Sequence, residues 1–245
     1  MRSHLLAVLL ILAATTANAV QPYLRLGLGA ERSQDVTQRD RNCGDIAPPA
    51  LFGCGSGPDG RTFGARGDFG RSFLGEVAGG FAIAPRTRLE LALAHRGDLA
   101  FDAQSNFLGV AGEQPVHASA RSTSALLTGF LDIRRVFVFA GAGAARNTLG
   151  TVTYAFPGIA PNAVTIAQGG THTAFAWTAG AGMNVPLSNR LSLDLALRFT
   201  DLGAFRTRSG PATIIRPTRS FTLDIAGTEA HARTLGLVAS LRWRL

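Results

Sequence analysis

The feature that most constrains this 245-residue chain is a strict two-residue alternation of apolar side chains over residues 175–201. In its second half, leucine occupies every other position across 191–197, while Asp194 and Arg198 fall on the opposite phase. Successive side chains of a β-strand point to opposite faces, so a period of two predicts strands and not a helix. The Pro-Leu-Ser-Asn segment at 186–189 is a turn sequence. The stretch is therefore predicted to be a β-hairpin.

The same test predicts eight strands along the chain, at about 22–31, 73–84, 88–99, 122–133, 136–146, 173–185, 190–201 and 231–245. Their connections alternate between short turns, at 85–87, 134–135 and 186–189, and long segments, at 32–72, 100–121, 147–172 and 202–230. Short periplasmic turns opposed to long extracellular loops are typical of outer-membrane barrels. The predicted fold class is all-β, an eight-stranded antiparallel up-and-down transmembrane β-barrel with both termini in the periplasm.

The first 19 residues have the composition of a secretory signal peptide. Arg2 precedes an apolar run at 5–14, and Ala17-Asn18-Ala19 is a small-residue cleavage site. An uncleaved anchor is the alternative. Residues 20–245 contain no apolar run long enough for a transmembrane helix, and no repeat or linker divides them. They are predicted to form a single outer-membrane β-barrel domain.

Two other classes of protein, a nucleic-acid binder and a soluble barrel, are less consistent with the sequence than a membrane barrel. Charged residues are only 16% of the chain, and all 24 basic residues are arginine. A sequence pI of 11.2 would suit a nucleic-acid binder. However, the arginines form no basic helix or patch, so no nucleic-acid partner is expected. A soluble barrel could turn its apolar face inward, but the loop asymmetry and the last strand favour a membrane protein.

If the apolar face of each strand meets lipid, the charged face lines a lumen that has room only for side chains. A buried unpaired charge is costly, so these side chains are expected to form structural ion pairs. The predicted set is Arg25, Glu76, Arg88, Glu90, Asp194, Arg198 and Arg242. A charged small-solute pore is the alternative interpretation.

Cys43 and Cys54 lie in the first long segment. In an oxidising compartment we expect them to form a disulfide that closes a small loop. A two-cysteine metal site is the competing interpretation, but no histidine lies near them in the sequence. Neither a metal site nor a cofactor is predicted.

His117 and Ser119 form a His-x-Ser pair near the loop end of the fourth strand. The pair is similar to that of the outer-membrane lipid A deacylases, in which His, Ser and Glu hydrolyse an acyl ester. No Glu occurs in the strand that follows, and Asp132 is predicted to lie at the opposite rim. The pair is therefore interpreted as a polar loop end, and the protein is predicted not to be an enzyme. A lipid A-modifying hydrolase is the alternative.

The fourth long segment, 202–230, is the most cationic and carries Arg206, Arg208, Arg216 and Arg219. Its apolar positions suggest strands that continue above the membrane: Ile214, Ile215, Phe221, Leu223 and Ile225. Arginine can meet phosphate or sulfate groups with two hydrogen bonds at once. We expect these arginines to contact an extracellular polyanion, with a merely solvated loop as the alternative.

The hairpin at 175–201 resembles the penultimate hairpin of the OmpA-like outer-membrane β-barrel family, in which a Trp-x-x-Gly-x-Gly strand meets a Leu-x-Leu strand ending on Arg and Tyr. The matching positions are Trp177, Gly180, Gly182, Leu193, Leu195 and Arg198, with Phe199 in place of the usual Tyr. The resemblance implies an outer-membrane location and a non-enzymatic role as envelope structure, antigen or adhesin.

Three kinds of partner are expected, of which the resemblance implies the host ligand and the barrel assembly machinery. These are outer-membrane lipid with lipopolysaccharide, an extracellular polyanion or host ligand, and the barrel assembly machinery. The machinery recognises the last strand, which commonly ends on Phe. This chain ends on Leu245, with Trp243 and Leu241 at the alternate positions.

Overall fold

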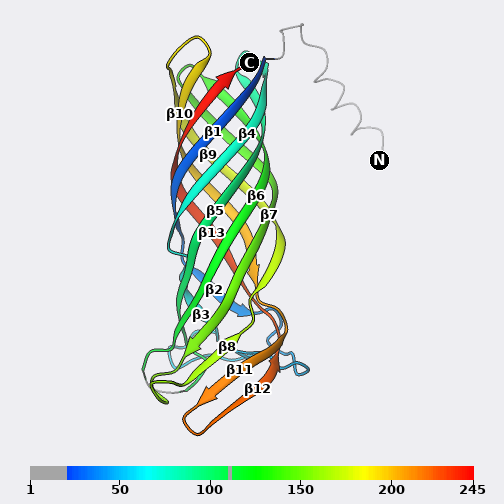
Figure 1. The fold of residues 1–245 in the computed structure, drawn as a ribbon, viewed down its shortest axis with the longest axis vertical. Helices are drawn as coiled ribbons and strands as arrows, with labels where there is room; N and C mark the ends of the chain where they lie inside the picture. The colour runs from blue at the N-terminus through cyan, green and yellow to red at the C-terminus, as the bar shows by residue number, and fades with distance from the viewer. Residues whose placement is uncertain (1–20, 110–111) are drawn as a thin grey trace, which may run out of the picture.

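The computed structural model describes residues 21–109 and 112–245 and shows a closed ring of long strands (Figure 1). The ring strands are β1 (Gln21–Ser33), β4 (Arg71–Ala84), β5 (Thr87–Ser105), β6 (Pro115–Ile133), β7 (Val136–Ala155), β9 (Gly170–Pro186), β10 (Leu191–Arg206) and β13 (Thr228–Arg244). Each pairs antiparallel with the next, and β13 pairs with β1. The ring leaves no open edge, and the predicted eight-stranded barrel is confirmed.

The strands agree with the predicted ranges at the short-turn end and run further at the other end. β7 ends at Ala155 where the alternation predicted 146, and β6 starts at Pro115 where it predicted 122. The long segments also contain β2 (Val36–Asp40), β3 (Ala65–Asp68), β8 (Val164–Ala167), β11 (Gly210–Arg216) and β12 (Arg219–Ile225). The predicted signal peptide lies outside the described residues. No helix in the described part of the chain is long and apolar enough to cross a membrane.

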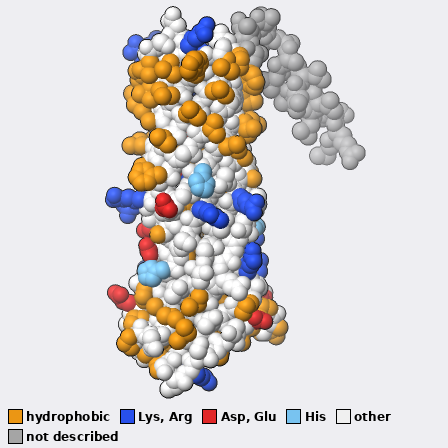
Figure 2. Space-filling model, in the orientation of Figure 1, with side chains coloured by type: hydrophobic (Ala, Val, Ile, Leu, Met, Phe, Trp, Pro, Cys, Tyr) orange, Lys and Arg blue, Asp and Glu red, His pale blue; other side chains and the backbone are white. Residues whose placement is uncertain are grey.

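An apolar belt covers the outer surface of the half nearest the short turns (Figure 2). Large exposed side chains make up this belt, among them Leu28 at 75% exposure and Leu237 at 67%. At mid-height the belt gives way to charged side chains (Figure 2). Five exposed arginines mark this boundary and are called the arginine ring: Arg32, Arg71, Arg121, Arg146 and Arg233. We call the half with the belt the membrane section. The other half carries the long loops, which are typically extracellular in such barrels, and is called the extracellular section.

The extracellular section has an apolar interior. Phe69 packs against Phe101 and Phe205, with ring centroids 5.1 and 4.7 Å away, and all three side chains are buried. Further buried apolar side chains continue this core, including Leu99, Val116, Leu149, Val152, Tyr154 and Leu202. The outer face of the same strands carries polar residues such as Asp102 and His117. The interior of the barrel is therefore charged in the membrane section and apolar in the extracellular section.

In β5 and β10 a β-bulge changes which sequence positions face the interior. In β5 the register shifts between Arg96 and Leu99, and Asp98 between them has a φ of 55°. Arg96 and Leu99 are both buried, so the inward step is three residues instead of two. A similar shift occurs in β10 before Gly203, whose φ is 71°. One added residue turns all following side chains to the other face, so apolar positions that meet lipid below the bulge meet the core above it.

Candidate functional site

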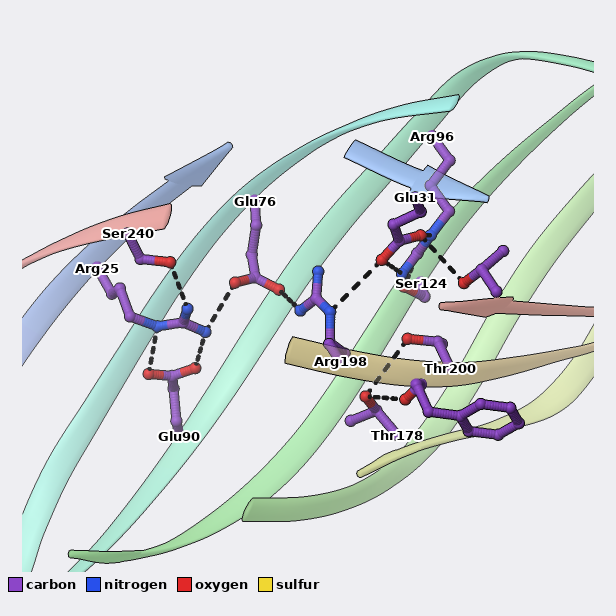
Figure 3. A network of polar contacts seen from close by, with 12 residues as sticks. Arg25, Glu31, Glu76, Glu90, Arg96, Ser124, Thr178, Arg198, Thr200 and Ser240 are labelled. Carbon is purple, nitrogen blue, oxygen red and sulfur yellow. Dashed lines mark hydrogen bonds and ion pairs between the residues drawn. The ribbon is translucent and has the colours of Figure 1, made fainter. Parts of the chain in front are cut away.

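A chain of charged side chains crosses the lumen of the membrane section (Figure 3). Arg25 on β1 donates from Nε to Glu90 on β5 at 2.9 Å, and its Nη2 lies 2.7 Å from Glu76 on β4. Arg198 on β10 donates to Glu76 from the other side at 2.5 Å. All four side chains are buried. The chain thus joins strands on opposite walls of the barrel.

The chain continues through two residues that are absent from the predicted set, Glu31 and Arg96. Arg198 Nε lies 3.5 Å from a Glu31 oxygen, and Arg96 Nε donates to the other oxygen at 2.6 Å. The Thr234 hydroxyl donates to the same carboxylate at 3.1 Å. Both missed residues are buried and lie at the level where the membrane section meets the extracellular core.

A second cluster lies nearer the short turns. Arg88 donates from Nε to Asp132 at 2.8 Å, and Arg242 Nε lies 3.1 Å from Asp194. The Arg88 guanidinium also lies 4.3 Å from the centre of the Phe130 ring, within the range of a cation–π contact. The structure therefore places every predicted lumen residue inside the barrel, beside a group of opposite charge.

The lumen charges balance, and their side chains fill the space. Carboxylates match the arginines one for one: Arg25, Arg88, Arg96, Arg198 and Arg242 against Glu31, Glu76, Glu90, Asp132 and Asp194. The cavity beside Arg25, Glu76, Asp194 and Arg198 measures about 30 Å³. This volume holds roughly one or two waters. The barrel is plugged at this level by its own side chains.

The first long loop is fastened at two points. Cys43 and Cys54 form the disulfide expected from the sequence. The Asp40 carboxylate accepts hydrogen bonds from the backbone N–H groups of 51–53, at 2.8 to 2.9 Å. Burial raises the pKa of the Asp40 carboxyl above its ordinary value, and the three donors act in the opposite direction. The loop therefore has a fixed conformation around its cysteines.

This conformation seats Phe52 in the extracellular core. Its ring lies 5.1 Å from Phe107 and 5.9 Å from Tyr154, in edge-to-face geometry. Phe107 in turn contacts Phe156 at 5.7 Å. Aromatic pairs of this geometry add to the energy of apolar burial. The first loop thus packs onto the outward end of the barrel, and the extracellular section is a filled platform.

The structure separates the four arginines predicted to contact a polyanion. Arg206 and Arg208 lie at and just beyond the end of β10, and Arg206 donates to Glu229 at 3.0 Å. Arg216 and Arg219 flank the turn between β11 and β12. There Arg216 donates to a backbone oxygen of β8 at 3.0 Å, and Arg219 lies 5.1 Å from the Phe221 ring. They form two pairs and not one cluster.

The pair Arg206 and Arg208 is joined by an arginine outside the predicted set. Arg41 donates to the Ser209 hydroxyl at 3.3 Å, directly beside Arg208. Partial burial lowers the pKa of His172, and Arg206 and Arg41 both act in the same direction. Arg41 and Arg206 therefore lie near the same histidine, and Arg208 precedes the serine that Arg41 contacts. We call Arg41, Arg206 and Arg208 the basic corner.

His117 and Ser119 lie on the outer face of β6, above the apolar belt. His117 Nδ1 lies 2.5 Å from a carboxylate oxygen of Asp102, and both side chains are 62% exposed. The acid comes from β5, the strand before the His-x-Ser pair, and not from the strand that follows the pair. Within 21–109 and 112–245 no hydrogen bond joins Ser119 to His117. No group of residues suited to hold a metal ion occurs in that part of the chain.

Comparison with known proteins identifies the architecture. No protein-family model matches the chain, and no curated protein matches its sequence. The outer membrane protease OmpT from Escherichia coli aligns over 96% of this chain and 100% of its own, with 8% identity and a TM-score of 0.50. OprG from Pseudomonas aeruginosa aligns over 93% and 96%, with 11% identity and a TM-score of 0.49. At 8% identity the likeness to OmpT concerns the fold alone, and it agrees with the outer-membrane β-barrel seen in the ring of strands.

Proposed function

We propose that this protein is a non-enzymatic barrel of the outer membrane with a structural or surface-interaction role, similar to that of an adhesin or surface antigen. The observation that carries this proposal is the filled extracellular section, on which the first loop is fastened by the disulfide and by Asp40. A fixed surface binds a partner without the entropy cost of ordering loops. The plugged lumen argues against the alternative of a small-solute pore.

The resemblance of the 175–201 hairpin to the OmpA-like family supports the same role. It also supports two partners in the envelope. Lipid and lipopolysaccharide surround the apolar belt, and the barrel assembly machinery would recognise β13, whose Leu241 and Trp243 are exposed on the outer face at 47% and 58%. The proposed extracellular ligand is a polyanion, and the basic corner is the better of the two arginine pairs because a third arginine joins it.

Binding of a sulfated or phosphorylated polysaccharide tests the ligand. Arg206→Gln/Arg208→Gln should weaken heparin binding by about tenfold at low salt and leave barrel assembly intact, because two cationic contacts are lost. Arg216→Gln/Arg219→Gln removes the same charge from the other pair and is the matched control. If both variants bind like the wild type, the extracellular section does not bind polyanions. Equal losses would refute the assignment to the basic corner.

A second candidate function is acyl-ester hydrolysis on the outer wall, which the contact between Asp102 and His117 favours. A carboxylate that orients a histidine is part of many hydrolytic sites. Incubation of the protein with lipid A, followed by mass spectrometry, separates the two functions. Loss of an acyl chain from lipid A with the wild type, but not with His117→Ala or Ser119→Ala, would replace the non-enzymatic proposal. Unchanged lipid A would exclude hydrolysis of this substrate.

A further inference from the structure

A groove of about 490 Å³ lies on the outer wall, where the apolar belt meets the arginine ring. Its floor is Ala30 on β1, whose small side chain faces Phe73 on β4 and Leu237 on β13 across the two strand pairs. Leu197 and Leu235 extend the same side. Phe73 is 82% exposed and Leu237 67%, so both walls project from the barrel surface. The shape and the apolar lining suit a hydrocarbon chain lying against the wall.

Two arginines stand at the extracellular end of this groove. Arg32 on β1 and Arg71 on β4 are direct partners in the strand ladder, and both are exposed. Like charges placed directly opposite each other destabilise a sheet. Among the described residues neither arginine forms an ion pair, and the nearby Asp201 carboxylate is paired with Arg233 at 3.1 Å. The protein itself therefore leaves this pair of positive charges unbalanced.

An anion with several oxygens would balance them. Guanidinium groups bind phosphate with paired hydrogen bonds, and two guanidinium groups can share one phosphate. The bond strengthens at the edge of a hydrocarbon layer, where the dielectric constant is low. The arrangement thus combines a phosphate site with an acyl-chain site, two residues apart along β1, from Arg32 to Ala30.

We propose that this groove binds one phosphorylated glycolipid of the outer leaflet, of the lipid A type, with the phosphate between Arg32 and Arg71 and an acyl chain over Ala30. The arginine pair lies on the side of the belt away from the short turns, which is the outer leaflet. A lipid with several acyl chains also matches the further exposed apolar side chains beside the groove. The site lies on the barrel wall and does not depend on any loop function.

Native mass spectrometry of the whole purified barrel with added lipid A tests the site. Arg32→Gln/Arg71→Gln should lower lipid A affinity by about tenfold, because a charge-assisted contact of this kind is worth about one order of magnitude. The matched control is Arg121→Gln/Arg146→Gln, which removes two arginines of the same ring on β6 and β7 and should change affinity less than about twofold. Heat-modifiable mobility in SDS confirms that each variant is folded.

A second variant separates the groove from the charges. Ala30→Phe fills the floor and keeps both arginines, so it should weaken lipid A binding and leave binding of deacylated, soluble glucosamine phosphate unchanged. Dephosphorylated lipid A should bind the wild type as weakly as lipid A binds the double glutamine variant. The proposal is overturned if the control pair loses as much affinity as Arg32 and Arg71, if dephosphorylated lipid A binds as tightly as lipid A, or if phosphatidylglycerol competes equally well.

Discussion

The membrane section and the extracellular section share the same eight strands and have opposite interiors. The membrane section hides paired charges and exposes leucines, whereas the extracellular section hides phenylalanines and exposes polar side chains. The medium outside the wall explains the difference, because each section turns toward its surroundings the face that those surroundings solvate. The side chains on the other face of each strand must fill the interior. They do so by ion pairing in the membrane section and by close packing in the extracellular section.

The two interiors should therefore fail in different ways. The stability of an ion-paired interior depends on equal numbers of positive and negative charges. Each buried charge has lost its hydration, and only a partner of opposite sign compensates for that loss. An apolar interior depends on volume, since an empty space loses contacts and burial. The following substitutions separate these two dependences.

The largest effect is expected from Glu76→Ala in the membrane section. Arg25 and Arg198 would both lose a partner while remaining buried, at a cost of about 3–5 kcal/mol. Urea unfolding in detergent, followed by the mobility shift of the folded band, measures this loss. The control is Glu76→Met/Arg198→Met, which removes one charge of each sign and should recover most of the stability. A double variant as unstable as the single one would contradict the account based on charge balance.

Phe69→Ala tests the extracellular core. The side chain is fully buried against Phe101 and Phe205, so the cavity should cost about 3–4 kcal/mol. The damage should stay in that section. Limited proteolysis should cut the loops faster, while the membrane section keeps its heat-modifiable mobility. Loss of that mobility would mean that the two sections unfold as one unit.

A charge placed on the outer face should locate the boundary between the sections. Leu195→Arg lies in the apolar belt and should cost about 2–4 kcal/mol, because it faces hydrocarbon. Ala100→Arg on the outer face of the extracellular section should be nearly neutral, and Ala196→Ser, which lines the lumen, should be mild. Folding yield into lipid vesicles measures all three. Equal harm from both arginines would show that the bilayer reaches beyond the arginine ring.

The smallest effect is expected from Asp40→Ala in the first loop. Three backbone N–H groups at 51–53 would lose their acceptor, which should loosen the loop by about 1–2 kcal/mol without unfolding the barrel. Hydrogen exchange at these amides should become faster. Asp59→Ala removes an exposed carboxylate from the same loop and should leave their exchange rates unchanged. Unaltered exchange in Asp40→Ala would assign the loop conformation to the disulfide alone.

The sequence was sufficient to predict the membrane section. Its strands keep one phase of alternation from turn to turn, and the turns are short, so both the face and the strand ends near the turns could be read directly. The lumen residues followed from that phase. Glu31 and Arg96 were missed although they continue it, Glu31 in phase with Arg25 and Arg96 in phase with Glu90. Both lie inside the predicted ranges 22–31 and 88–99, so following the alternation to every inward position of those ranges would have found them.

The extracellular section could not be predicted in the same way. Its strands alternate with the same period, but the bulge at Asp98 reverses which positions of β5 face the interior. A single inserted residue has no clear signature in composition. The contact between Asp102 and His117 depends on the pairing of β5 with β6 beyond that bulge. The separation of Arg206 from Arg216 likewise depends on how β11 and β12 fold back as a hairpin. Both arrangements depend on the register of strand pairing, which the local sequence does not encode.

The distribution of arginine also has a mechanical meaning. The charges inside the membrane section cancel, so the excess of positive charge lies at its two rims, in the arginine ring on one side and at the short turns on the other. The turn arginines are Arg86, Arg134, Arg135 and Arg190, and all are exposed. Sliding the barrel along its axis in either direction would drag one rim into hydrocarbon, at about 2–4 kcal/mol for each arginine that reaches the bilayer midplane. The two rims of arginines therefore fix the depth of the protein in the bilayer, even when a force pulls on its outer end.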